Sequence, residues 1–393
     1  MTLLLELEFV DKRIQPRWLD WRAKMLFKNI MPIGGGKAVL IGRDEDGNRY
    51  PLINLVNGEY KFGFSMDEEL GFLLNQEYVV KKKPLTAGLP FHYHRIPFRI
   101  MINKMLVKLK KRRLKKVFPS WPRDASVDIL VHIKGVINKS EPRSWAGNKK
   151  YAVMLSHDID TYGGLKRINK LLEIEKEYVV RSTNFIVGNY YEIKKEILKE
   201  ITKSGGEIGL HGDNHDALLP YLDENEINKR LEKCRGFINE YKIIGFRAPS
   251  LLMTRNLDNS IKKFFKYDSS ITDTELFMPD SDYSGSCTVF PFFRDGILKI
   301  PITLPMDSSL IFLGYDADEI LEIWIDKLEF IKKIGGIATI VVHSEKHFGA
   351  SDKMLDAYRK FIEYLAKDKD VWIATGKDVY EYLKDKKNVT RIN

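Results

Sequence analysis

Short apolar runs alternate with amphipathic segments from about residue 150 to the end of the chain. Runs typical of strands occur near 151–156, 183–187, 207–210, 242–246, 297–301, 337–342 and 371–374. Segments with a helical period occur at about 164–177, 191–203, 223–240, 316–333, 353–366 and 376–386. Strands that alternate with helices predict an α/β fold with a mostly parallel sheet, either open or closed into a barrel. In both forms, functional side chains are expected at the carboxyl ends of the strands.

The chain before residue 140 has shorter and less regular apolar runs. Residues 37–56 are expected to form a hairpin that turns at Asp44–Asn48, because turn-forming residues there separate two apolar runs. Polar and turn-forming residues dominate 138–150, which we interpret as a linker. The pattern therefore predicts a smaller α+β domain over residues 1–140, with no indicated role, followed by a larger α/β domain.

The length of 393 residues and the hydrophobic content of 44% fit two domains with ordinary cores. The two cysteines, Cys234 and Cys287, have neither metal-ligand nor redox spacing, which excludes a disulfide scaffold and favours a reducing compartment. Glu6 and Glu8 interrupt the apolar N-terminus, and no segment approaches the roughly 20 apolar residues that a membrane-spanning helix needs. We therefore predict a soluble, cytoplasmic protein.

The net charge of +10, from 64 Lys and Arg against 54 Asp and Glu, allows an anionic partner without identifying one. A dense basic run from Lys104 to Lys116 lies in residues 98–118, beside an apolar face. Such a basic amphipathic helix can make peripheral contact with an anionic membrane or a phosphate-bearing partner. The alternative is a helix docked on the larger domain with its lysines in water. No nucleic-acid-binding motif accompanies the charge, so nucleic acid is not an expected partner.

Acidic and imidazole side chains follow two of the predicted strands. Asp158 and Asp160 end the run that begins at residue 151, and His211 and His215 follow the run at 207–210. Together, such pairs can hold a divalent metal and leave a position open for water and substrate. One carboxylate could bind the metal while the other takes a proton from water. Each pair alone is more typical of a surface histidine or a solvated acidic turn, so the metal hypothesis depends on their joint occurrence.

Two further residues follow strands in the same way. Arg247 comes directly after the run at 242–246 and could pair with the base carboxylate, which would keep that carboxylate ionised. His343 ends the apolar run from Gly336 and fits a general acid, with Asp268 as a candidate orienting partner. Taken singly, the arginine would be part of a turn and the histidine part of the core.

Five motif regions together resemble a known family, the polysaccharide deacetylases of carbohydrate esterase family 4, which carry the NodB homology domain. The regions occur in the order and approximate spacing of that family, over about residues 148–386. They are Ser156–Asp160, His211 with His215, Phe246–Pro249, Tyr267–Ser270 and Val342–His343.

The resemblance implies a catalytic domain over residues 148–386, with the fold of a distorted (β/α) barrel of about seven strands. It also implies a divalent metal, with Zn²⁺ as the expected ion. The implied ligands are Asp160, His211 and His215.

The resemblance further assigns roles to the remaining site residues. It makes Asp158 the general base, Arg247 its tether and His343 the general acid, and Asp268 would tune His343. The implied reaction is hydrolysis of an N-acetyl group on an amino sugar in a saccharide, glycan or glycoconjugate. Acetate and a free amine would leave, and a backbone N–H would help to stabilise the oxyanion.

The chain departs from the commoner family pattern at two positions. Ile159 separates two aspartates that are usually adjacent, so the roles of Asp158 and Asp160 could be exchanged. Ser250 stands where an aromatic residue often follows the proline, which alters the wall of the sugar site. This D-x-D branch also resembles amide hydrolases of cyclic imides or ureides, so a non-sugar amidase is one alternative. A glycan-binding module without catalysis is the other.

Overall fold

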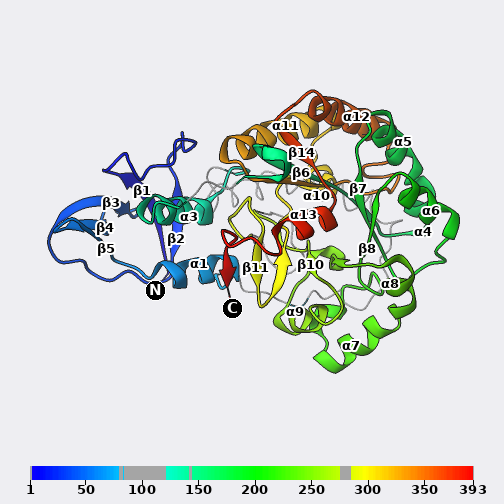
Figure 1. Ribbon diagram of the computed structural model, residues 1–393, viewed down its shortest axis with the longest axis horizontal. Coiled ribbons are helices and arrows are strands. Elements are labelled where there is room, and N and C mark those ends of the chain that lie inside the picture. The colour runs from blue at the N-terminus through cyan, green and yellow to red at the C-terminus, as the bar shows by residue number, and fades with distance from the viewer. Residues whose placement is uncertain (1, 79–82, 84–120, 141–143, 275–284, 393) are drawn as a thin grey trace.

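The computed structural model describes residues 2–78, 83, 121–140, 144–274 and 285–392 (Figure 1). The basic segment predicted over 98–118 lies outside these residues. No helix in the described ranges is long and apolar enough to cross a membrane.

The first part of the chain forms an antiparallel sheet with the strand order β2-β1-β3-β4-β5. Leu5, Leu7 and Phe9 alternate with more exposed residues along β1, so one face of this sheet is buried. The hairpin predicted over 37–56 is confirmed, because β3 pairs with β4. The elements are β1 (Leu3–Phe9), β2 (Lys24–Phe27), β3 (Lys37–Arg43), β4 (Arg49–Val56), β5 (Glu59–Phe62), α1 (Met66–Leu74) and α3 (Ser126–Ile137).

The second sheet begins with a parallel series in the order β13-β6-β7-β8-β9-β10-β12. All residues of β6 are buried, as expected for a central parallel strand covered on both faces. The strands are β6 (Tyr151–Ile159), β7 (Ser182–Ile186), β8 (Glu207–Leu210), β9 (Gly245–Phe246), β10 (Tyr267–Asp268), β11 (Phe292–Arg294), β12 (Ile297–Lys299), β13 (Ile337–Val341), β14 (Val371–Ile373) and β15 (Arg391–Ile392).

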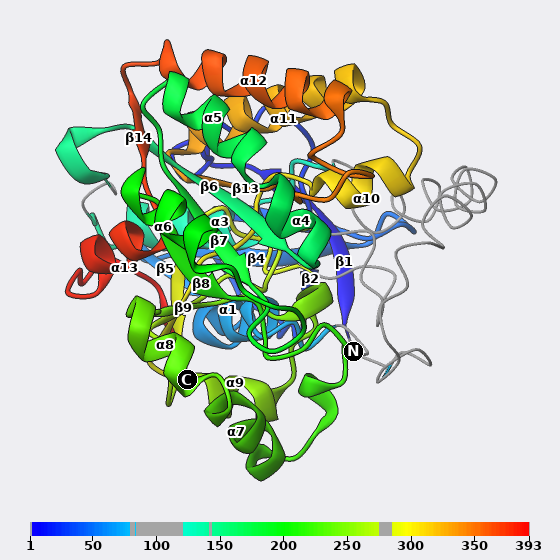
Figure 2. The same cartoon turned by 90° about the vertical axis from the view of Figure 1, so that its right-hand side faces the viewer.

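The parallel sheet curls until its two ends meet. Beyond β12, the backbone N–H groups of Thr303 and Leu304 donate to the carbonyl of Thr339 in β13, over 3.2 and 3.0 Å. Helices cover the outside, with α5, α11 and α12 together on one flank and α7 and α9 on another (Figure 2). The structure therefore confirms the predicted distorted (β/α) barrel preceded by a smaller N-terminal sheet.

The helices are α4 (Tyr162–Arg167), α5 (Asn169–Glu177), α6 (Lys195–Lys203), α7 (Glu224–Glu232), α8 (Arg235–Tyr241), α9 (Arg255–Ile261), α10 (Asp307–Phe312), α11 (Ala317–Ile334), α12 (Asp352–Ala366) and α13 (Gly376–Leu383). Each predicted strand after residue 150 is present, and the predicted helices at 164–177 and 223–240 are each divided in two. The elements that the pattern missed, among them β10 and α10, are too short to show a period.

The N-terminal sheet stands beside the barrel (Figure 1), and apolar side chains join the two. Trp18 and Trp21 pack edge-on against Phe330 of α11, with ring centroids 6.5 and 5.3 Å away. Asp128 of α3 accepts hydrogen bonds from the Thr288 hydroxyl and the Val289 backbone N–H, over 2.5 and 2.9 Å. The buried core is thus continuous between the sheets, and the domain boundary at residue 140 stays a prediction.

Candidate active site

Two carboxylates leave β6 on the same face of the sheet. Asp158 is the penultimate residue of β6 and Asp160 follows its last residue, so the period of two directs both side chains to one side. They are only 2% and 5% exposed. His157 points the opposite way, where its Nε2 lies 2.6 Å from Glu175 Oε1. His157 therefore lies outside the carboxylate face.

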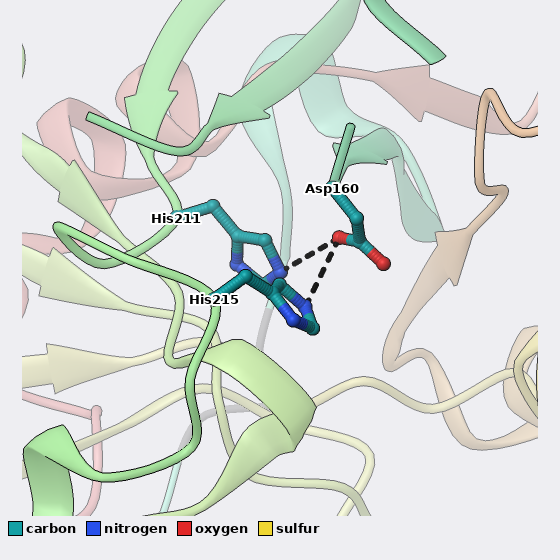
Figure 3. Close-up of side chains that lie close together, drawn as sticks. All are labelled: Asp160, His211 and His215. Atoms are coloured by element: carbon teal, nitrogen blue, oxygen red, sulfur yellow. Dashed lines mark ion pairs between the residues drawn. The ribbon is translucent and has the colours of Figure 1, made fainter. Parts of the chain in front are cut away.

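The loop after β8 brings two histidines to Asp160 (Figure 3). The Nε2 atoms of His211 and His215 lie 3.2 and 3.4 Å from Asp160 Oδ1. One ligand atom from each of the three residues lies within 4.8 Å of the others. The backbone between the histidines is not helical and turns through Gly212, whose φ is +66°. A left-handed residue is therefore what folds the His-x3-His segment back on itself.

The hydrogen bond behind the His211 ring is compatible with a bound cation. Its Nδ1 lies 3.0 Å from the carbonyl oxygen of Arg247, which can only accept, so Nδ1 carries the proton. In a neutral ring, Nε2 then presents its lone pair to Asp160 Oδ1. Either a bound cation or a proton on Nε2 would relieve the repulsion between these two electron-rich atoms. The cluster offers two imidazole nitrogens and one carboxylate oxygen, a ligand set that suits Zn²⁺. The carbonyl that accepts from His211 Nδ1 is the kind of partner that orients a metal-binding imidazole.

Arg247 holds Asp158 by one carboxylate oxygen. The fully buried guanidinium donates from Nη1 to Asp158 Oδ1 over 2.7 Å and to the Ser156 hydroxyl over 3.0 Å. Its other edge donates to the carbonyl and hydroxyl of Ser269, each over 2.8 Å. The second oxygen, Asp158 Oδ2, lies 3.9 Å from His211 Nε2. Asp158 therefore presents one oxygen to the cluster while the other is fixed.

His343 lies on the opposite side of Asp160, and its partner is Asp307. His343 Nε2 is 4.0 Å from Asp160 Oδ2, and His343 Nδ1 is 2.6 Å from Asp307 Oδ1. Asp307 Oδ2 also accepts from the His343 backbone N–H over 2.8 Å. The prediction that Asp268 tunes His343 is therefore wrong. Asp307 begins the short helix α10, which the hydrophobic pattern did not predict.

The site's charges shift the pKa values of the carboxylates downward. Burial alone would raise the pKa of Asp158, but Arg247, and to a smaller degree His211 and His343, outweigh it and lower that pKa below 3.8. Burial opposes His215 and His211 at Asp160 in the same way, and the pKa of Asp160 ends well below 3.8. Both carboxylates are therefore ionised at neutral pH.

The imidazole of His343 shifts in the other direction. Burial lowers its pKa, but the Asp307 carboxylate outweighs that effect and raises it from 6.5 to about 10. A protonated ring at neutral pH can donate a proton to a leaving group. Asp307 therefore occupies the position beside His343 that the sequence analysis had assigned to Asp268.

Asp268 instead belongs to a charge network with Lys299, Asp258 and Arg294. It accepts from the fully buried Lys299 over 2.9 Å and from the Ser270 hydroxyl. Lys299 also binds Asp258 over 2.5 Å, and Arg294 pairs with Asp258. Since the Ser270 hydroxyl accepts from the Ala248 backbone N–H, this network supports the turn that follows Arg247.

We predict that Lys299→Met lowers the free energy of unfolding by about 3–5 kcal/mol, because it leaves the buried carboxylate of Asp268 without its cation. Denaturant unfolding followed by circular dichroism measures this loss. The matched control is Lys150→Met, which breaks the Lys150–Asp370 pair with side chains 71% and 41% exposed and should cost at most about 1 kcal/mol. Equal unfolding midpoints for the two variants would contradict the prediction.

Glu345 supports the turn that presents Asp160. Its Oε1 accepts from the backbone N–H groups of Asp160 and Thr161, over 3.1 and 3.0 Å. Gly164 makes room for it, because a Cβ atom there would lie 2.2 Å from Glu345 Oε1 and 2.7 Å from the Ser344 hydroxyl oxygen. Sequence reasoning missed Glu345, although its place two residues after His343 was a signal.

The chain is similar in sequence to known proteins. Residues 146–265 match the sequence model of the family described as polysaccharide deacetylase. The peptidoglycan deacetylase of Helicobacter pylori is 24% identical over 254 residues, which cover 57% of this chain and 86% of that protein.

Two solved structures share the fold. One is a Mycobacterium smegmatis protein assigned to the polysaccharide deacetylases, with a TM-score of 0.53 and 23% identity over 65% of this chain and 97% of that one. The other is Puue allantoinase, with a TM-score of 0.52 and 17% identity over 64% of this chain and 96% of that one. The barrel, the matched residues and the curated relative together confirm the resemblance found in the motifs. The chain is therefore similar to the polysaccharide deacetylase family over residues 146–265.

Proposed function

We propose that this protein is a metal-dependent hydrolase that removes N-acetyl groups from an amino sugar in a saccharide, glycan or glycoconjugate. The observation that carries the proposal is the Asp160–His211–His215 cluster, with the tethered Asp158 and the Asp307-bound His343 beside it. The family of residues 146–265 and the name of the Helicobacter pylori relative support a sugar as the substrate class.

In this proposal Asp160, His211 and His215 hold a divalent metal, with Zn²⁺ expected. When bound, such an ion supplies a Lewis acid that activates water and polarises the amide carbonyl. The assignment of Asp160 rather than Asp158 as the ligand rests on its 3.2 and 3.4 Å distances to the two Nε2 atoms.

The chain's own groups move the protons. Asp158, ionised and held by Arg247 at Oδ1, takes a proton from the attacking water at Oδ2. His343, protonated and held by Asp307 at Nδ1, gives a proton from Nε2 to the leaving amine. Asp158 Oδ2 lies 3.9 Å from His211 Nε2 and His343 Nε2 lies 4.0 Å from Asp160 Oδ2, so both proton-transfer groups border the proposed ligands.

Metal removal tests the proposal. We expect dialysis against a chelator to abolish acetate release from acetylated glucosamine oligomers, and Zn²⁺ or Co²⁺ to restore it. Metal analysis of the purified protein should give about one ion per chain. Full activity in a protein stripped of divalent metal would refute the proposal.

A substrate panel separates the sugar from the alternatives. Because the fold is shared with an allantoinase, turnover of cyclic ureides and imides should be measured beside turnover of acetylated glucosamine oligomers. Turnover of a ureide alone would identify a non-sugar amidase, and glycan binding without turnover in the presence of several metals would identify a binding module. The cytoplasmic location and the membrane contact through 98–118 stay predictions.

A further inference from the structure

The loop that carries both histidines is braced by one arginine outside the site. Arg230 extends from α7 and donates from Nε to Asp213 Oδ2 over 2.7 Å and from Nη2 to Asp213 Oδ1 over 2.9 Å. The same Nη2 donates to Asp216 Oδ2 over 3.0 Å. Asp213 and Asp216 stand on either side of His215 in the chain. A single guanidinium therefore fixes the backbone both before and after this proposed ligand.

Backbone hydrogen bonds from the described residues support the first half of this loop. The N–H groups of Gly188 and Asn189, beyond β7, donate to the carbonyls of Gly212 and Asp213, over 3.0 and 2.7 Å. These bonds hold the first half of the loop. The side chain of Asp216 accepts from the Leu218 backbone N–H over 3.0 Å, so the second half is tied to the first through Arg230.

The side chains of Arg230, Asp213 and Asp216 are largely shielded from water, so water screens the interactions between their charges only weakly. The side chains of Arg230, Asp213 and Asp216 are 13%, 7% and 14% exposed. Two carboxylates this close would repel each other without the guanidinium. The planar guanidinium of Arg230 binds one carboxylate at two points and so fixes the orientation of that carboxylate, whereas a lysine ammonium group cannot.

We propose that Arg230 is a positioning residue for the metal ligands, which keeps His215 within reach of Asp160 and His211 before a cation arrives. The proposal rests on the metal site of the proposed function. If the hydrogen bonds from Arg230 to Asp213 and Asp216 are weakened, the affinity for the metal should fall, because metal binding must then also order the loop.

The test is metal binding by Arg230→Lys, measured on metal-free protein with Zn²⁺ in competition with a chromophoric chelator and with the visible spectrum of added Co²⁺. We expect binding about 10- to 100-fold weaker than in the wild type. The matched control is Arg235→Lys, which alters an exposed pair with Glu232, with side chains 46% and 52% exposed, and should leave binding unchanged.

Thermal unfolding with and without Zn²⁺ separates positioning from general stability. An arginine that only anchors α7 would lower Tm equally in both conditions, so the rise in Tm caused by Zn²⁺ would stay the same. A positioning role predicts a smaller rise, because stabilisation by a ligand depends on its affinity. Asp216→Asn, which removes one of the three bonds, gives a milder variant with a smaller loss of affinity.

The outcomes distinguish this inference from the proposed function. If the wild type binds neither Zn²⁺ nor Co²⁺, the metal site itself is refuted and the inference falls with it. If the wild type binds metal and both brace variants bind it equally well, with the same rise in Tm, only the role of Arg230 is overturned.

Discussion

Replacing Asp158 by Asn should lower kcat by about 10²- to 10⁴-fold while the protein keeps its metal. An amide cannot take the proton from water, but it has nearly the size of the carboxylate and can still accept from Arg247 at Oδ1. Acetate release under saturating substrate measures the loss, and metal analysis of the same sample measures retention. The expected result is therefore an inactive protein with about one ion per chain.

The matched variant is Asp160→Asn, two residues along the same strand face. It replaces the carboxylate that lies against both histidines, so we expect it to lose metal as well as activity. The pair also decides which aspartate of the D-x-D motif has which role. If Asp158→Asn loses the metal and Asp160→Asn retains it, the two assignments must be exchanged.

Replacing His343 by Gln should lower kcat by about 10²- to 10⁴-fold without loss of metal, because no proton donor then faces the leaving amine. A substrate with an acidic leaving group needs less protonation, so its turnover should fall less. A fall of equal size for both substrates would contradict the role of general acid. Asp268→Asn should not reproduce the His343 defect, since Asp268 binds Lys299 instead.

Asp307→Asn should shift the pH dependence of the reaction. Asp307 raises the pKa of His343 from 6.5 to about 10, so the ring stays protonated through neutral pH in the wild type. Without that carboxylate, only Asp160 and Asp158 still oppose burial, so the pKa of His343 falls and activity should decline at a lower pH than in the wild type. A bound cation lowers the pKa in both proteins, so the difference between their pH profiles is the quantity to compare.

The same pair has a consequence for stability. A histidine whose pKa is higher in the folded state stabilises the fold fully below pH 6.5, and this contribution is lost as the pH rises toward 10. The stability difference between the wild type and Asp307→Asn should therefore shrink over this range. Urea unfolding at several pH values measures it, and a difference that grows with pH would have the wrong sign.

Much of the site could be predicted because its chemistry is local in the sequence. Asp160, His211 and Arg247 each come directly after a parallel strand, and parallel strands end at one edge of a sheet. The alternation along β6 was enough to separate Asp158 and Asp160 from His157. These inferences needed only strand positions and a period of two.

The residues that support the site could not be predicted in this way. Asp307 lies 36 positions before His343 and begins a helix of six residues, too short to show a period. Arg230 lies on a polar helix with the residue types of any solvated surface. Their partners are set by how α7 and α10 pack on the barrel, which no local pattern contains.

The sequence by itself determined the alternation of strands and helices and the mostly parallel sheet, because the hydrophobic period is a property of neighbouring residues. The barrel and the ligand set Asp160, His211 and His215 were implied by the resemblance of the motifs to a family. Only the tertiary structure decided which carboxylate orients His343, that Asp268 instead compensates a buried lysine, and that Arg230 braces the histidine loop. Which aspartate bonds to which partner depends on distances of a few ångströms between segments that are far apart in the chain. The aspartates have the same side chain, so only their positions in the fold decide which hydrogen bonds each one makes.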